Sequence, residues 1–278
     1  MKDVTFGQYY PAKSFVHKLD ARIKILLTIA YIVAVFLVKQ DGGFYQYTGF
    51  LACLLLVVVA TAFSGVPIFK VLKSVKGILF FIVLSAVLQV FFNKTGNTLW
   101  NWKFITITDR GLLSAGFIVA RITLIVLGSS LLTFTTSPVE IADGIESLMY
   151  PLKLIKFPVH EFALIMSIAL RFIPTLLDET DRIIKAQKAR GADFESGNLF
   201  KRAKALIPVL IPLLISSFRR ADELADAMDA RCYSGSKNRT KYKKMKLSWR
   251  DLIAFLLMAG LITGVVFLNI TGFMAVVV

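Results

Sequence analysis

Five long apolar runs, each almost free of charge, constrain this sequence more than any other feature. They cover residues 25–38, 48–63, 77–92, 112–134 and 251 to the C-terminus. A backbone that crosses a bilayer must satisfy its own hydrogen bonds, so runs of this kind predict transmembrane helices. The composition agrees, because 56% of the residues are hydrophobic and only 18% are charged, unlike an ordinary soluble domain. The sequence therefore predicts an all-α, polytopic membrane protein with about five transmembrane helices.

The stretch between the fourth and fifth apolar runs differs from the rest. The segment Ser137-Pro138-Val139-Glu140 has the cap, proline and glutamate of a helix start, and it predicts a short helix to about residue 150. Two long helices are expected at 159–192 and 198–233, followed by a basic linker. We thus predict three regions. Transmembrane helices 1–4 occupy 1–135, a cytoplasmic-face domain of one short and two long helices occupies 136–248, and the last transmembrane helix occupies 249–278.

The basic residues indicate which side of the membrane each segment faces. With a cytoplasmic N-terminus and five spans, 28 of the 33 Lys and Arg residues lie inside and 4 lie outside, as the positive-inside rule requires. Residues 64–76 are then an inside basic turn, and 93–110 an outside loop at the interface. The formal charge of +15 fits anionic lipid rather than nucleic acid, because the basic residues flank apolar runs.

Two further apolar runs, at 162–177 and 203–218, raise the question of two more spans. Both are shorter than the roughly 20 residues that a span requires. Pro174 interrupts the first and Pro208 and Pro212 the second, and crossing would move the basic cluster 182–204 outside. We expect both runs to stay at the cytoplasmic face, with apolar surfaces that a partner or the membrane covers. Seven spans, or a re-entrant hairpin, is the alternative.

The two long helices end alike, in Lys188-Ala189-Arg190-Gly191 and Asp229-Ala230-Arg231-Cys232, and the two arginines are 41 positions apart. An arginine at a helix C-terminus suits the helix dipole, and glycine commonly ends a helix, so one such ending is explained as a cap. Two endings with small neighbours also predict docking tips, whose guanidinium groups pair with carboxylates in a groove. A duplicated tip suggests a duplicated receiver. Cys232, standing where the first ending has glycine, predicts a less definite second helix end.

At these residues the chain resembles the EcfT (CbiQ-like) family, the transmembrane scaffold subunits of energy-coupling factor importers. The matching pieces are the segment from Ser137 to Lys153, Ala169-Leu-Arg-Phe-Ile-Pro174 and the two X-Arg-X endings. The resemblance implies a subunit that links two cytoplasmic ABC ATPases (EcfA and EcfA′) to a membrane-embedded, substrate-binding S component for the uptake of vitamins or other micronutrients. It also implies a plasma-membrane location, with the N-terminus cytoplasmic and the C-terminus outside.

The resemblance assigns roles to particular residues. It implies that the two endings dock into the two ATPases, and that apolar coupling-helix residues face the S component. The docking residues are Ala189, Arg190, Gly191, Ala230, Arg231 and Cys232. The apolar residues are Ile165, Leu170, Leu206, Leu210 and Leu214. No catalytic residue, metal or cofactor is expected on this chain, because ATP and Mg²⁺ would be bound by the partner ATPases.

The sequence also bears on functions other than coupling. The sequence lacks the glycine-rich phosphate loop of an ATPase. Asp222, Asp226 and Asp229 share one helix face, so a phospholipid-headgroup transferase using a divalent cation is the enzyme alternative. A self-contained channel is a third class, disfavoured by the lack of matched inverted halves.

A few single residues have expected roles outside the docking site. Arg121, inside a span, is a functional or bundle-stabilising candidate, and Arg171 is expected to pair with Glu161 or Asp178. His17 and His160 are interpreted as loop or interfacial residues. Cys53 and Cys232 are not expected to form a disulfide, and no metal-type cysteine or histidine spacing occurs.

Overall fold

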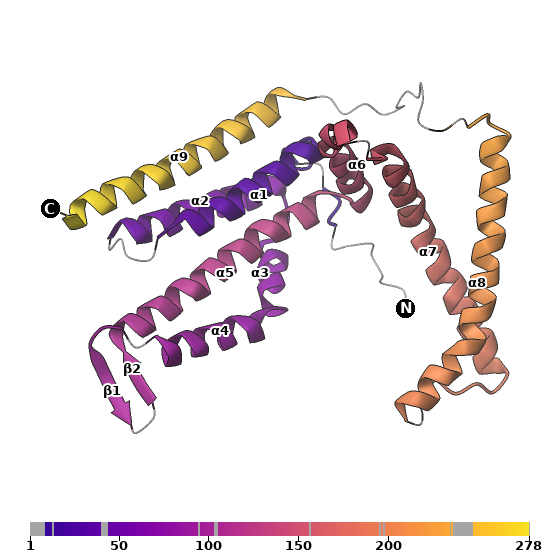
Figure 1. Ribbon diagram of the computed structural model, residues 1–278, viewed down its shortest axis with the longest axis horizontal. Helices are drawn as coiled ribbons and strands as arrows, with labels where there is room; N and C mark the ends of the chain where they lie inside the picture. Colours follow the sequence, from indigo (N-terminus) through magenta and orange to yellow (C-terminus); the bar gives the residue numbers. More distant parts are fainter. Residues whose placement is uncertain are drawn as a thin grey trace. The chain divides into compact units, whose positions relative to one another are not determined.

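The computed structural model consists almost entirely of helices and divides into two compact units (Figure 1). Within the described residues, the bundle unit comprises 9–144 and 247–277, and the long-helix unit comprises 145–235. The structure describes residues 9–12, 14–39, 44–93, 95–102, 105–155, 157–194, 196, 198–233, 235 and 247–277. The prediction of an all-α polytopic protein is confirmed, with one small β-hairpin added.

The bundle unit is organised around α5. This helix packs against α1, α2, α3 and α4, while α9 packs against α1 and α2. Buried side chains such as Tyr31, Val35, Cys53 and Leu127 form one core between these helices. The elements are α1 (Ala21–Leu37), α2 (Phe44–Ser64), α3 (Ile68–Lys76), α4 (Leu79–Phe92), β1 (Thr98–Trp102), β2 (Ile105–Thr108), α5 (Asp109–Thr135), α6 (Pro138–Leu148) and α9 (Trp249–Val277).

Several helices are long and apolar enough to cross a membrane. Among the described residues, α2, α5, α7 (Val159–Ala189) and α9 pass on length and composition. The pair α3 and α4, bent by 57°, makes a fifth candidate if it counts as one broken span. Helix α1 has 17 residues, about 25 Å at 1.5 Å per residue, and is shorter than α2, α5, α7 and α9. Helix α7 therefore qualifies on composition although the sequence analysis expects it at the cytoplasmic face.

Two predicted loops prove to be regular structure. The segment expected as a basic turn holds α3, which Pro67 precedes and Gly77 follows. The segment expected as an outside loop folds into the antiparallel pair β1 and β2. Thr108, at the end of β2, accepts a hydrogen bond from the Gly111 amide at 3.1 Å and caps α5. A side-chain cap of this kind satisfies one of the free amides at the start of a helix.

The start of α6 follows the predicted capping box. The Glu140 amide donates to the Ser137 hydroxyl at 3.3 Å, and the Ser137 amide donates to the Glu140 carboxylate at 3.2 Å. The division between the two units falls within this helix, between Gly144 and Ile145. The capping box is thus confirmed as a pair of reciprocal bonds.

A buried polar network joins the N-terminal end of α1 to its neighbours. Lys24 is 5% exposed, and its ammonium donates to the carbonyls of Thr135 at 2.9 Å and His17 at 3.2 Å. Asp251, at the start of α9, accepts from the amides of Asp20 at 2.9 Å and Ser248 at 2.7 Å. Both charged side chains therefore form hydrogen bonds with backbone groups that would otherwise lack partners.

The opposite end of α1 is capped by side chains from two other helices. Arg121 of α5 donates to the Val38 carbonyl at 2.6 Å, and Asn269 of α9 donates to the Leu37 carbonyl at 2.7 Å. These are among the carbonyls that a helix end leaves without an internal partner. Arg121 thus takes the bundle-stabilising role that the sequence analysis had left open.

The long-helix unit begins in the last turn of α6 and continues with the short helix η1 (Tyr150–Ile155), α7 and α8 (Leu199–Asp229). Both long helices continue through their prolines, Pro174 in α7 and Pro208 and Pro212 in α8. Their lengths agree with the two long helices that the sequence predicts.

Candidate partner-docking site

Helices α7 and α8 form an antiparallel pair, and their two C-termini are far apart. Gln187 near the end of α7 donates to the Pro208 carbonyl at 3.5 Å, and Glu179 pairs with Arg220 at 3.2 Å. Residue numbers therefore rise along α7 as they fall along α8, and Figure 1 shows the two helices crossing. Each helix has 31 residues, about 46 Å. The C-terminus of α7 and that of α8 consequently lie at opposite ends of the pair.

The first ending closes α7 with a Schellman motif. Arg190 is the last residue of the cap, and Gly191 adopts a φ of 87°. The Ala192 amide donates to the Gln187 carbonyl and the Gly191 amide to the Lys188 carbonyl, both at 3.0 Å. These are the two bonds that define the motif. Arg190 is therefore held at the tip of the helix while its side chain is free to leave it.

The second ending repeats this geometry residue for residue. Cys232 adopts a φ of 56°. The Tyr233 amide donates to the Met228 carbonyl at 3.1 Å, and the Cys232 amide donates to the Asp229 carbonyl at 2.9 Å. The expectation that Cys232 makes this helix end less definite was therefore wrong. The left-handed turn forms in spite of the Cβ atom of the cysteine. Arg231 occupies the same position in its motif as Arg190 does in the first.

We call residues 189–191 and 230–232 the arginine tips. All six of their residues are exposed, and a Cβ atom added to Gly191 would meet nothing within 4 Å. Within the part of the chain that the structure describes, neither arginine forms a side-chain hydrogen bond or ion pair. Each tip thus offers a charged fork, flanked by small residues, that can enter a groove and bind a carboxylate bidentately.

The ion pair between Glu179 and Arg220 is a feature that sequence reasoning missed. These residues are 41 positions apart, the same offset as the two tip arginines. Their side chains are 27% and 33% exposed, so the pair contributes modestly to stability. The shared offset of 41 residues could have indicated this pair, because it relates an acidic position of α7 to a basic position of α8.

Most of the predicted apolar docking residues are exposed. Ile165 is 63% exposed on α7, and Leu210 and Leu214 are 57% and 58% exposed on α8. Leu206 is exposed too, whereas Leu170 is half-buried. On α8 these residues belong to a wider apolar stripe that the sequence analysis did not name in full. The apolar stripe comprises Leu206, Ile207, Leu210, Ile211, Leu214, Ile215 and Phe218.

The remaining candidate residues show no catalytic arrangement. Asp222, Asp226 and Asp229 are all exposed, and the described residues contain no cluster of three or more metal-ligand side chains. Arg171 is exposed, and among the described residues it forms no ion pair with Glu161 or Asp178, so that expectation was wrong. This arrangement gives the enzyme alternative no support.

The two histidines and two cysteines lie in ordinary structural settings. His17 lies in the N-terminal turn between the Ser14 hydroxyl and the Tyr10 carbonyl. His160 lies 3.6 Å from the Glu146 carboxylate. Cys53 is buried, Cys232 is exposed, and both are free thiols.

Known proteins similar to this chain indicate the family to which it belongs. The family described as "CbiQ: Cobalt transport protein" matches residues 12–242. A relative from Clostridium kluyveri is 49% identical over 257 residues, which are 92% of this chain and 93% of the relative. One from Acidaminococcus fermentans is 48% identical over 269 residues, 97% and 98% of the two chains. Both carry the name "Energy-coupling factor transporter transmembrane protein EcfT".

Membrane-length helices and these similarities define the class first: a multi-pass membrane component of a transporter. More particularly, the chain belongs to the EcfT family of energy-coupling factor transporter transmembrane proteins, within the wider CbiQ group. Members of this family are named as transporter components and not as enzymes.

Proposed function

We propose that this chain is the coupling subunit that links two cytoplasmic ABC ATPases to a substrate-binding S component in the membrane. ATP hydrolysis by the partners then drives uptake of a vitamin or another micronutrient. The observation that carries the proposal is the pair of matched, exposed arginine tips at opposite ends of one antiparallel helix pair.

The spacing of the tips supports two receivers. Helices of 31 residues separate their two C-termini by a distance on the order of 40 Å, so one groove cannot hold both arginines. Two copies of a groove, one on each ATPase, can. Because the tips share one backbone geometry, they suit two grooves of similar shape.

The apolar stripe supports a second partner of different character. Seven large hydrophobic side chains exposed on one side of α8 need cover from lipid or from protein. We propose that the S component covers them together with Ile165 and Leu170 of α7. A smooth apolar contact allows sliding between the two partners, which suits a subunit that transmits movement.

Charge supports the orientation of the chain. We propose a cytoplasmic N-terminus, an external C-terminus and both long helices at the cytoplasmic face of the plasma membrane. Helix α7 is apolar enough to cross, but a crossing would carry the basic cluster 182–204 outside, against the positive-inside rule. In this orientation both arginine tips face the cytoplasm, where ATP and Mg²⁺ are bound by the ATPases and not by this chain.

Charge reversal at the tips tests the proposal. The double variant Arg190→Glu and Arg231→Glu should release both ATPases during co-purification, because each groove carboxylate would then face a like charge. Each single variant should retain one. The control is Arg182→Glu with Arg219→Glu, which alters exposed arginines of the same two helices away from the tips. Full ATPase retention by the tip variant, with normal membrane insertion, would refute the docking role.

A further inference from the structure

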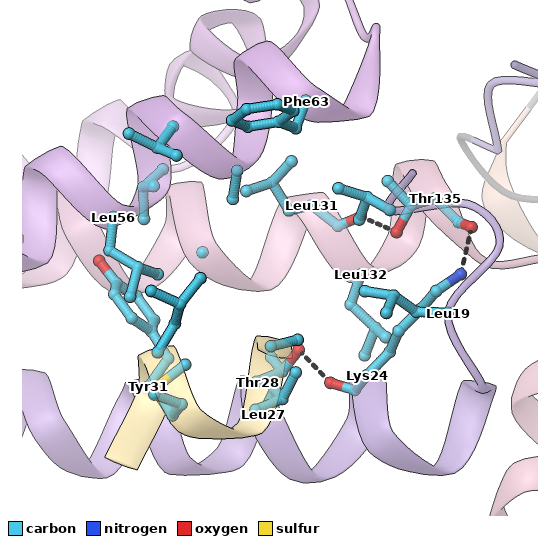
Figure 2. A pocket seen from close by; sticks show the side chains of 18 of the residues that line it. Leu19, Lys24, Leu27, Thr28, Tyr31, Leu56, Phe63, Leu131, Leu132 and Thr135 are labelled. Carbon is cyan, nitrogen blue, oxygen red and sulfur yellow. Dashed lines mark hydrogen bonds between the residues drawn. The ribbon is translucent and has the colours of Figure 1, made fainter. Parts of the chain in front are cut away.

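The bundle unit contains an apolar cavity that the proposed coupling role does not use. Its volume is about 360 Å³, and its wall is formed by α1, α2, α5, α9 and the turn before α1. Figure 2 shows side chains from these elements converging on it, with Leu56 and Phe63 on one side and Leu27, Thr28 and Tyr31 on another. This volume falls at the small end of ordinary ligand pockets.

The polar side chains in the wall are already hydrogen-bonded. The Lys24 ammonium binds the Thr135 carbonyl at 2.9 Å, and the hydroxyl of Thr28 binds the Lys24 carbonyl at 2.8 Å (Figure 2). The Tyr31 hydroxyl binds the Leu124 carbonyl at 3.4 Å, and the Thr135 hydroxyl binds the Leu131 carbonyl at 2.7 Å. The rest of the wall is apolar. A hydrophilic solute would lose its hydration here without new partners, whereas a hydrocarbon would not.

The cavity opens sideways, between helices long enough to cross the membrane. Phe63 of α2 and Leu257 of α9 both line it, yet they are 63% and 62% exposed. The wall uses the N-terminal part of α1 and α9 and the C-terminal part of α2 and α5, so it lies at one end of the bundle. The opening therefore meets one leaflet only, the leaflet next to the start of α1.

A cation lies at the rim of the cavity. The Arg250 guanidinium carbon is 5.9 Å from the centre of the Phe15 ring, and Phe15 is a half-exposed residue of the wall. Among the described residues, Arg250 has no ion pair. A phosphate at this height would find an unneutralised positive charge directly beside the apolar cavity.

We propose that this cavity holds one acyl chain of an anionic phospholipid, whose phosphate lies beside Arg250. The lipid belongs to the leaflet that meets the start of α1. It fills space between α1, α2, α5 and α9 that the side chains leave open. This role is independent of ATPase docking and needs no assigned substrate.

A photoactivatable lipid tests the inference. The full chain, in its membrane complex, is reconstituted with phosphatidylglycerol bearing a diazirine in one acyl chain, and the labelled peptides are mapped. Label is expected to concentrate on residues 56–63 of α2 and 253–258 of α9. Ala60→Phe, which places a ring in the cavity, should lower this labelling about tenfold, because it excludes at least two methylene groups. Ala52→Phe is the matched control, on the same helix and exposed outside the cavity.

Three results would overturn the inference. One is even labelling of all lipid-facing helices. A second is unchanged labelling in both Ala60→Phe and Ala254→Phe. The Ala254→Phe variant fills the cavity from the facing helix α9, so the test does not depend on one substitution. The third is labelling of the isolated chain that vanishes in the complex, because a protein side chain would then occupy the cavity. The headgroup is tested separately: Arg250→Gln should remove the preference for phosphatidylglycerol over phosphatidylcholine, and an unchanged preference would refute the anionic contact.

Discussion

The bundle unit and the long-helix unit use their polar residues in opposite ways. In the bundle, Lys24, Asp251 and Arg121 all bond to backbone groups of neighbouring segments. In the long-helix unit, the side chains of the tip arginines are exposed and bond to no described residue. A charged side chain that bonds to the backbone of neighbouring segments stabilises the fold, whereas an exposed charge without such bonds is available to a partner. The contrast separates residues that build this protein from residues that connect it to others.

The apolar side chains show the same contrast. Tyr31, Val35 and Cys53 are buried in the bundle core, while the apolar stripe of α8 is exposed over its whole length. A substitution in the bundle should therefore change stability first. A substitution in the long-helix unit should change binding first and stability little.

The largest stability effect is expected at Gly128 of α5. A Cβ atom there would lie 2.3 Å from the buried ring of Tyr31, so Gly128→Ala forces the core apart and should cost about 3 kcal/mol. Thermal unfolding in detergent measures it. Gly116→Ala is the control on the same helix, because its Cβ would meet nothing within 4 Å, and it should be neutral or stabilising. Equal losses of stability in the two variants would contradict the contrast between the packed core of the bundle and its exposed surface.

An intermediate effect is expected at the second arginine tip. Cys232 holds a left-handed conformation that glycine adopts without cost, so Cys232→Gly should stabilise this turn by about 1 kcal/mol. Hydrogen exchange of the Cys232 and Tyr233 amides should slow accordingly. Gly191→Ala is the mirror change and should speed exchange at the first tip. If the two substitutions move exchange in the same direction, the tips are not equivalent in geometry.

The smallest effect is expected at the ion pair between α7 and α8. Because Glu179 and Arg220 are both partly exposed, a double-mutant cycle with Glu179→Gln and Arg220→Gln should give a coupling of about 0.5 kcal/mol. Unfolding of the isolated chain measures it. A coupling several times larger would mean that internal contacts, and not partners, hold the long-helix unit in shape.

Cysteine labelling in the long-helix unit can show on which side of the membrane the two ends of α8 lie. The native Cys232 is exposed and Cys53 is buried, so an impermeant maleimide should label Cys232 from the cytoplasmic side alone. Ser196→Cys in a Cys232→Ser background should behave identically. Labelling of the two positions from different sides would place α8 across the membrane and exclude the proposed orientation.

Features set by local sequence could be predicted, and those set by tertiary contact could not. The reciprocal bonds of Ser137 and Glu140 and the extents of α7 and α8 follow from capping signals and apolar periodicity. Helix α3 was missed because Gly65 and Pro67, which precede it, are typical turn residues. The left-handed conformation of Cys232 was missed because the residue at this position of a helix end is usually glycine.

The partners of Lys24, Asp251 and Arg121 lie beyond any local pattern. Lys24 and Thr135 are 111 positions apart, and Asp20 and Asp251 are 231 apart. Only packing brings such residues together. At the docking site the sequence identified the tips but not the ion pair between Glu179 and Arg220, which depends on how α7 and α8 align.

The capped end of α1 bears on how this protein fits bilayers of different thickness. Helix α1 has 17 residues, about 25 Å, against a hydrocarbon layer of about 30 Å. The carbonyls of Val38 and Leu37 at this end are bound by Arg121 and Asn269, so these two groups need no water where the helix ends within the hydrocarbon layer. Such hydrophobic mismatch is ordinarily relieved by thinning or tilting. Here two side chains of the bundle satisfy carbonyls at the end of the short helix, which lowers the cost of the mismatch.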